Sequence, residues 1–551
     1  MTRALDAAAV LLTAALFLVA SVGGIDVEFG PLRLRVHDWM RPAVALAVVL
    51  AGRAALGATA RVASYVATRG MLALLFASAG VYAHYQVRVA GGLDSYGYVS
   101  TAASIASGRL SEPQPLADVL PFDNPLSAAT PLGHVAGADG RSSVPRFPVG
   151  LPLVMALFMV FGSAGPFFVP FVMACVTLVL AYQIGRESSC RLTGLFAATL
   201  VAMDPLFVVY ATQPMSDVPA TCWLVAAVWL ALRTGGTDRP FLLGLAAGGC
   251  AGMAMLTRPA LLPAVALLVL VAARRKAPRL AFAFGATVLA FVAIQAALNV
   301  RLYGSPTASG YGPASHMFEL SFARFSANVS NFGKWLTYSH TPLFWLLWPG
   351  ALLVLRQHRL VWEVSAVAAA AAAPYLFYIV FDDWESSRFL LPSLTLVLIL
   401  AARAIGHLTR RSPLAHAMVV FPIALACAAA SHQFLQKEGL DRYRPAEAKY
   451  ALVGDWFARH TPERTVVLAA LHSGTIRMYG GRQTIRWDRI PDTALAATLR
   501  RLSASGYEPY LALDLPTEPP LFEERFRGQP VNVEQVARVR VVNIYRFVSA
   551  H

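Results

Sequence analysis

Residues 91–100, GGLDSYGYVS, place a carboxylate, Asp94, beside two tyrosines, Tyr96 and Tyr98, just after an apolar run. A carboxylate is a suitable general base for a hydroxyl group, because it accepts the proton as the hydroxyl reacts. Aromatic rings stack on sugar rings, so the three side chains together suit a carbohydrate. Two structural roles stay open: Asp94 is also a good helix N-cap, and the tyrosines are also typical of a membrane interface.

Three arginines adjoin other apolar runs: Arg258 in LTRPALL, Arg301 in NVRLYGS and Arg388 in DDWESSRFLLPSL. Guanidinium groups there suit the negative charge that develops on a leaving phosphate group. Each is otherwise a membrane anchor or the partner of a loop acid. For Arg388, that acid would be one of the neighbouring residues Asp382, Asp383 and Glu385.

A second candidate carboxylate is Asp217, which precedes Pro219 and so also resembles a helix N-cap. Asp94 and Asp217 are too few to predict a metal site. The five cysteines lie in or beside apolar runs and show neither a disulfide framework nor a metal-ligand spacing. We therefore expect no bound cofactor, and the sequence leaves a need for a divalent metal open.

The composition indicates that these residues sit on membrane helices. The chain of 551 residues is 57% hydrophobic and only 14% charged, too apolar for a soluble protein of this length. Its apolar residues form runs long enough to cross a bilayer, and we expect about thirteen spans. Their approximate ranges are 5–22, 43–59, 70–89, 166–184, 192–210, 219–233, 241–257, 260–273, 280–300, 341–355, 361–381, 389–406 and 413–433.

The charges of the loops predict the orientation. The net charge of +15 comes almost entirely from arginines in short clusters between apolar runs, a pattern typical of membrane topology and not of nucleic-acid binding. With a cytoplasmic N-terminus, nearly every basic cluster falls inside, and Asp94, Asp217 and Asp382 fall outside. This assignment requires the short segment 149–162 to lie on or dip into the outer face without spanning.

Two outer segments follow from this topology. The loop 90–165 is rich in Pro, Gly, Ser and Asp, and such a long loop is usually functional or disordered. The tail after residue 436 predicts an extracytoplasmic α/β domain, with helices near 446–459 and 492–504 and strands near 465–471, 510–513 and 539–547. Within it, His472-Ser473 is interpreted as a solvated turn.

An outward-facing transferase needs a donor carried in the lipid, such as a sugar on a polyprenyl phosphate, because nucleotide sugars are not generally available outside a bacterial inner membrane. Four segments, in order and on the expected side, resemble the GT-C superfamily of membrane glycosyltransferases. The resemblance is closest to its protein O-mannosyltransferase and lipid A aminoarabinose transferase branch. The segments are LDSYGYVSTA, DGRSSVPRFPVGLPLVMALFMVFG, MDPLFVVYATQPMSDVPATCW and SSRFLLPSLTLVLILAARAI.

The resemblance implies that Asp94 is the catalytic base and that the donor is a lipid-phosphate sugar. It covers about residues 70–435, so we expect additional helices in 1–69, a catalytic membrane domain in 70–435 and the soluble domain in 436–551. The chain departs from the family pattern at Gly97, between the tyrosines, and at Arg146-Phe147, where a second proline is common.

The sequence therefore predicts an integral enzyme of the bacterial inner membrane, with its C-terminal domain outside. It would transfer a sugar to a hydroxyl of a glycan, lipid or protein acceptor, with no nucleic-acid partner. Asp94 is the expected catalytic residue, and the expected substrate contacts are Tyr96, Tyr98, Asp217, Arg258, Arg301 and Arg388. The alternative is a transporter or lipid flippase whose outer domain binds a ligand, although no internal repeat supports it.

Overall fold

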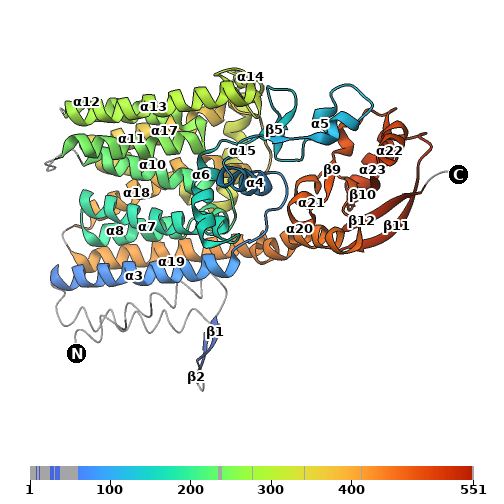
Figure 1. Cartoon of the computed structure of the whole chain (residues 1–551). Coiled ribbons are helices and arrows are strands. Elements are labelled where there is room, and N and C mark those ends of the chain that lie inside the picture. Colours follow the sequence, from blue (N-terminus) through green and yellow to red (C-terminus); the bar gives the residue numbers. More distant parts are fainter. Residues whose placement is uncertain are drawn as a thin grey trace.

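The computed structural model describes residues 60–233, 239–275, 277–340, 342–410 and 412–548. It also describes a short antiparallel pair near the N-terminus, β1 (Ile25–Phe29) and β2 (Leu32–Val36). The expected helices 5–22 and 43–59 fall outside these ranges. The described chain forms a helical bundle, and a smaller α/β domain sits at one end of it (Figure 1).

Every span expected after residue 70 coincides with a helix or a helix pair. The main break is at Asp204, where one expected span divides into α8 and α9, bent by 69°. The bundle helices are α3 (Ala60–Tyr85), α7 (Phe168–Ser188), α8 (Arg191–Ala202), α9 (Pro205–Ala211), α10 (Asp217–Leu232), α11 (Pro240–Thr257), α12 (Leu262–Arg274), α13 (Pro278–Tyr303), α15 (Phe322–His340), α16 (Leu347–Leu355), α17 (Arg359–Leu376), α18 (Leu391–Leu408) and α19 (Pro413–Lys437).

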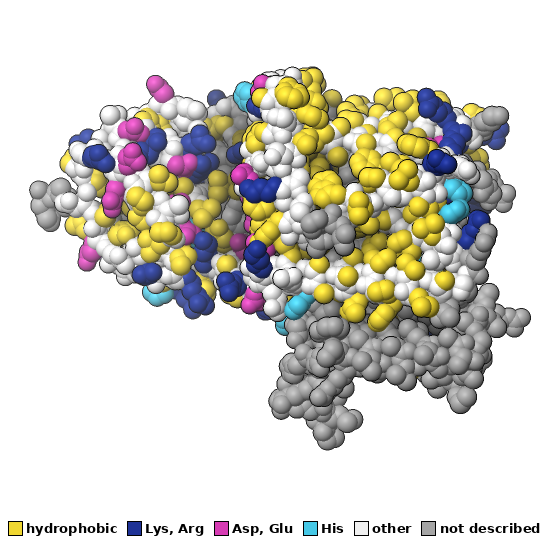
Figure 2. All heavy atoms as spheres, turned by 180° about the vertical axis from the view of Figure 1, so that it is seen from behind, with side chains coloured by type: hydrophobic (Ala, Val, Ile, Leu, Met, Phe, Trp, Pro, Cys, Tyr) yellow, Lys and Arg dark blue, Asp and Glu magenta, His cyan; other side chains and the backbone are white. Residues whose placement is uncertain are grey.

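The bundle identifies an integral membrane protein. Within the described ranges, five helical stretches are long and apolar enough to cross a membrane, or six if α8 and α9 form one span. Several others, such as α10 and α12, are apolar but shorter. Among the described residues, the criterion of length and composition therefore identifies fewer spans than the thirteen expected. Hydrophobic side chains cover most of the visible bundle surface, and acidic ones gather over the α/β domain and its junction with the bundle (Figure 2).

The basic loops meet at the end of the bundle opposite the α/β domain. There Arg275 Nη1 donates to the carbonyl of Leu232 at 3.2 Å, and Arg359 Nη2 donates to the carbonyl of Arg274 at 3.4 Å. These contacts join the ends of α10, α12 and α17. Arginines from loops that are far apart in the sequence therefore lie together at one end of the folded bundle.

The loop 90–165 is ordered and structured. It contains α4 (Asp94–Ala106), η1 (Pro115–Val119), α5 (Pro125–Ala129), α6 (Gly150–Phe158) and a small sheet of β3 (Glu112–Pro113), β5 (Ser142–Pro145) and β4 (His134–Ala136). The helix α6 is nine residues long, too short to span, and lies at the bundle end near α4 (Figure 1). Its last turn and the following η2 (Met159–Phe161) expose Leu157, Val160 and Phe161 at 74–80%, a composition suited to lipid.

The C-terminal domain is an α/β unit, as expected. Its sheet has the order β11-β12-β10-β8-β9, in which β9, β8 and β10 run parallel and β12 and β11 are antiparallel additions. Its elements are α20 (Leu440–His460), β8 (Thr465–Leu468), α21 (Ser473–Gly480), β9 (Gln483–Ile485), η7 (Trp487–Arg489), α22 (Leu495–Ala504), β10 (Glu508–Asp514), α23 (Glu518–Arg525), β11 (Asn532–Val539) and β12 (Val542–Val548).

Two features of this domain differ from expectation. Residues Leu116 and Ala128 of the outer loop share a hydrophobic core with Val466 of β8, so the packed unit includes chain from before residue 436. The predicted solvated turn at His472 is wrong: His472 is fully buried, and its Nε2 lies 3.0 Å from Asp514 Oδ2. A polar histidine is buried here because the fold provides it with a carboxylate partner.

Candidate active site

Asp94 is the first residue of α4, at the end of the bundle that carries the α/β domain. The position before it, Leu93, is the N-cap, and no side chain caps the helix by a hydrogen bond. The Asp94 carboxylate instead accepts a hydrogen bond from Arg388, with Nη2 and Oδ2 separated by 3.0 Å. The capping role considered for Asp94 is therefore not what its side chain does.

Arg388 comes from η6 (Glu385–Leu390), just before α18. Besides Asp94, it approaches Asp217, with 3.9 Å between Nε and Oδ1, and its guanidinium lies over the rings of Tyr210 and Phe389 at 5.5 and 5.4 Å. A planar, permanently charged group is well suited to such aromatic contacts.

The neighbouring acids that the sequence offered to Arg388 have other partners. Asp382 pairs with Lys334 at 2.8 Å, and Asp383 accepts a hydrogen bond from the backbone N–H of Ser386 at 2.7 Å. Glu385 accepts from the hydroxyl of Tyr443, with 3.3 Å between the oxygens. Arg388 is therefore directed toward the carboxylates of two other helices.

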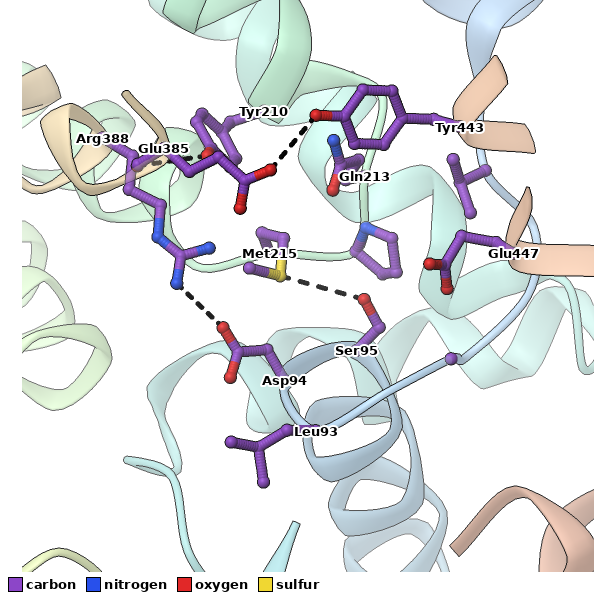
Figure 3. Close-up of a pocket in the computed structure, with 13 residues that line it drawn as sticks. Leu93, Asp94, Ser95, Tyr210, Gln213, Met215, Glu385, Arg388, Tyr443 and Glu447 are labelled. Atoms are coloured by element: carbon purple, nitrogen blue, oxygen red, sulfur yellow. Dashed lines mark hydrogen bonds and ion pairs between the residues drawn. The ribbon is translucent and has the colours of Figure 1, made fainter. Parts of the chain in front are cut away.

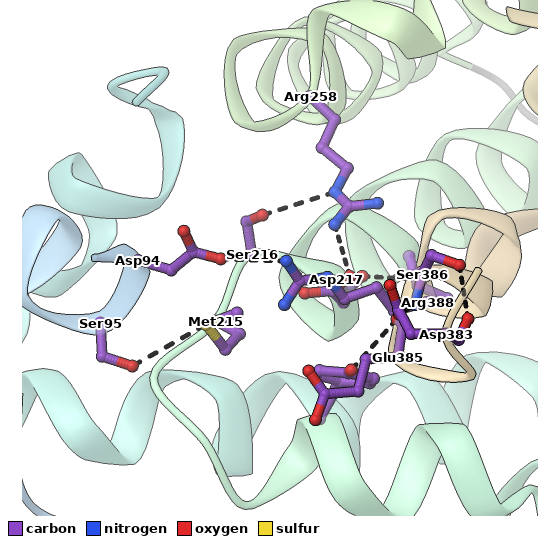
Figure 4. A network of polar contacts seen from close by, with 12 residues as sticks. Asp94, Ser95, Met215, Ser216, Asp217, Arg258, Asp383, Glu385, Ser386 and Arg388 are labelled. Carbon is purple, nitrogen blue, oxygen red and sulfur yellow. Dashed lines mark hydrogen bonds and ion pairs between the residues drawn. The ribbon is translucent and has the colours of Figure 1, made fainter. Parts of the chain in front are cut away.

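Arg258 holds the second half of the network. It lies at the end of α11, is buried, and forms an ion pair with Asp217, whose side chain is 1% exposed. Its Nε donates to Ser216 Oγ at 3.4 Å (Figure 4). The hydroxyl of Tyr98 donates to the same oxygen at 3.0 Å. Removing the partner of a buried carboxylate leaves an uncompensated charge, so the pair with Arg258 is what stabilises Asp217.

Five of the seven predicted site residues thus meet in one network: Asp94, Tyr98, Asp217, Arg258 and Arg388. Tyr96 does not join it, because its ring packs against Gly474 of the α/β domain and edge-on to His134 at 5.8 Å. Arg301 is exposed near the end of α13 and does not line the cavity described next.

A cavity of about 340 Å³ opens beside Asp94 and Arg388 (Figure 3). This volume is within the usual range for a small-ligand site. Its lining residues are Val87, Gly91, Leu93, Asp94, Ser95, Tyr210, Gln213, Pro214, Met215, Glu385, Arg388, Tyr443 and Glu447.

The sequence did not single out Tyr443 and Glu447 as site residues. Both lie on α20, the helix that leads into the α/β domain, and they are four residues apart and so share one helix face. Their four-residue spacing is the local signal in the sequence. It indicates a site only once α20 is seen to pack against residue 91. Among the described residues, no group of three or more His, Cys, Asp or Glu side chains gathers as a metal site.

Comparisons with known proteins give one family match and several similar solved structures. Residues 145–298 match the model of the family described as dolichyl-phosphate-mannose-protein mannosyltransferase. The structure resembles ArnT from Cupriavidus metallidurans bound to undecaprenyl phosphate, with a TM-score of 0.53, 13% identity, and coverage of 87% of this chain and 98% of that chain. No curated protein matches the chain.

The same ArnT in the apo state gives a TM-score of 0.53 at 11% identity, over 91% of this chain and 98% of that chain. At such identity the likeness establishes the fold. The shared fold and the family match over residues 145–298 both agree with the resemblance to the GT-C superfamily that the motifs indicated. The transporter or flippase alternative is not favoured.

Proposed function

We propose that the protein transfers a sugar from a polyprenyl-phosphate donor to an acceptor hydroxyl, and that Asp94 and Arg388 perform the chemistry. The observation that carries the proposal is their direct contact at the rim of the cavity, which brings a candidate base and a candidate phosphate ligand within 3.0 Å. The similar ArnT structure holds undecaprenyl phosphate, which supports a donor of this class.

In the proposed reaction, the acceptor oxygen attacks the anomeric carbon of the sugar while Asp94 takes the proton from that oxygen. The bond between the anomeric carbon and the phosphate oxygen breaks, and the phosphate keeps the electron pair. Arg388 then neutralises the charge that develops on the phosphate. A single displacement of this kind inverts the anomeric configuration.

Arg258 and Asp217 act as positioning residues in this scheme. Arg258 is buried and is not among the residues that line the cavity, so it reaches the donor only through Asp217. Asp217 in turn lies close to Arg388 and orients its guanidinium group. Tyr98 extends the same support through Ser216.

The site is proposed to face the outside of the bacterial inner membrane. It lies at the bundle end opposite the basic loops, and basic loops favour the cytoplasmic side. The acceptor would then be a glycan, lipid or protein of the cell envelope.

A reconstituted transfer assay tests the proposal. The purified protein in liposomes is given undecaprenyl phosphate carrying one of several neutral pentoses or hexoses, together with a cell-envelope extract as acceptor source. Consumption of at least one glycosylated lipid, with release of undecaprenyl phosphate and inversion at the anomeric carbon, is expected. Failure of every donor to be consumed, alongside normal folding, contradicts it.

A further inference from the structure

One wall of the cavity is formed by α20, which is outside the apolar part of the bundle. Tyr443 is fixed by its hydrogen bond to Glu385, with 3.3 Å between the oxygens. Glu447, one turn further, packs against the backbone of Gly91: a Cβ atom at Gly91 would lie 1.9 Å from Glu447 Oε2. The absence of a side chain at residue 91 therefore makes room for this carboxylate.

The Glu447 carboxylate is a partly buried acceptor without a donor in the protein. No described residue donates a hydrogen bond to it, and the nearby cation Lys449 is directed to Asp514 Oδ2 at 2.5 Å instead. Burial raises the pKa of Glu447 to about 7, and Lys449 offsets this only in part. A carboxylate that faces a cavity and has no donor in the described part of the protein is available to a ligand that provides the donor.

The two sides of the cavity differ in charge. Arg388 and Asp94 lie on one side, and Glu447 and Tyr443 project from the other (Figure 3). If the phosphate of the donor binds at Arg388, its sugar extends away from that cation and toward α20. The carboxylates of Glu447 and Glu385 would repel an anionic sugar and accept hydrogen bonds from hydroxyl groups.

From this arrangement we infer that Glu447 binds hydroxyl groups of the donor's neutral sugar and so determines how tightly the glycosylated lipid is held relative to the bare lipid phosphate. This inference rests on the proposed function. It gives α20 a direct part in the substrate site, in addition to its connection to the α/β domain. Glu447 would be a specificity residue, and Asp94 would remain the base.

The test measures binding of two kinds of probe to the purified full-length protein by native mass spectrometry. One probe is bare undecaprenyl phosphate, and the others are the same lipid carrying a neutral pentose or hexose. We expect the wild-type protein to prefer at least one glycosylated form. Glu447→Ala should reduce that preference by roughly ten- to a hundredfold, the effect of losing hydrogen bonds to a charged group, with unchanged affinity for the bare lipid.

Two further variants make the result specific. Glu447→Gln keeps the shape and one acceptor oxygen, so it should retain part of the preference. Asp455→Asn is the matched control, because Asp455 lies on the same helix, is 47% exposed and pairs with Arg459. It should bind all probes as the wild type does.

Three results would overturn the inference: a wild-type protein that prefers no glycosylated form, a Glu447→Ala variant that keeps the full preference, or an equal loss of bare and glycosylated lipid in that variant. The proposed function fails separately. That failure would appear as bare-lipid binding that does not depend on Arg388, whatever the Glu447 variants do.

Discussion

Arg388 Nη2 and Asp94 Oδ2 lie 3.0 Å apart although 294 positions separate the two residues in the chain. The pair joins the start of α4 to the turn before α18. A phosphate group competes well for an arginine, because it offers several charged oxygens in a matching geometry. Donor binding would therefore draw Arg388 from Asp94 to the phosphate and leave the carboxylate available to an acceptor hydroxyl.

The first prediction concerns the base. Asp94→Asn should fold and still bind undecaprenyl phosphate, but sugar transfer should fall by about two to four orders of magnitude, the usual contribution of general-base catalysis. Asp382→Asn is the control, because Asp382 is 62% exposed and pairs with Lys334 outside the cavity. Transfer rates of the purified proteins in liposomes decide the point, and a near-normal rate for Asp94→Asn would leave Asp94 as a structural residue.

The second prediction separates the two arginines. Arg388→Ala should weaken binding of bare undecaprenyl phosphate and slow transfer, with a loss of about 3 kcal/mol of transition-state stabilisation. Arg258→Ala should mainly destabilise the protein, because it leaves the buried Asp217 with a distant cation only. Lipid titrations and thermal melts of both variants distinguish these effects. Equal loss of lipid affinity at similar stability would contradict the division of roles.

The third prediction uses a glycine. A methyl group at Gly91 would fall 1.9 Å from Glu447 Oε2 and 2.3 Å from the Tyr450 ring, so the side chains of Glu447 and Tyr450 must move in Gly91→Ala. We expect this variant to lose preference for glycosylated lipid, as we also expect of Glu447→Ala. Gly80→Ala is the control, because nothing lies within 4 Å of a Cβ at Gly80. Unchanged sugar preference in Gly91→Ala would show that the contact with Glu447 does not shape the site.

The fourth prediction concerns the side of the membrane. A cysteine introduced at Glu534, an exposed position of β11, should react with a membrane-impermeant thiol reagent in intact spheroplasts. Cys190 is a native control: it is exposed between α7 and α8, at the basic end of the bundle, and should react only after permeabilisation. The opposite pattern would place the candidate active site in the cytoplasm.

The sequence predicted the described helices of the bundle and named five residues that the fold brings into one network, because apolar runs and short motifs are local signals. It could not pair Arg388 with Asp94, since the nearer acids at 382–385 are equally plausible partners and only tertiary packing excludes them. It also proposed Tyr96 as a substrate contact. Tyr96 and Tyr98 are two residues apart on α4 and so point to roughly opposite faces, which directs Tyr98 to the network and Tyr96 to the α/β domain.

The two departures from the family pattern, Gly97 and Phe147, lie against each other in the fold. A Cβ at Gly97 would lie 2.5 Å from the ring of Phe147, and that ring packs against Tyr98 with centroids 4.8 Å apart. The glycine between the tyrosines therefore accommodates the aromatic residue that stands where a proline is common. In the sequence, each departure weakens the resemblance to the family. Their connection is not visible there, because the residues are fifty positions apart and meet only in the fold.

The fifth prediction follows from Glu447. Burial raises its pKa from 4.5 to about 7, so the fold disfavours the ionised form. Below pH 4.5 the carboxyl is protonated in both the folded and the unfolded protein and has no effect on the free energy of unfolding. Between pH 4.5 and 7 the unfolded chain loses the proton first, so this group lowers the stability as the pH rises, and the loss is complete above pH 7.

Glu447→Gln is neutral at every pH and escapes that cost. Without ligand, the variant should melt at a temperature roughly 1–4 °C above that of the wild type at pH 8. The difference should vanish near pH 4.5, and Asp455→Asn should follow the wild type at both values. A glutamine variant that is more stable but less selective for glycosylated lipid is expected of a binding residue, because sites often retain charged groups at the expense of stability. An equal effect at both pH values would mean that glutamine changes the packing of α20, and that ionisation of Glu447 carries no cost to the fold.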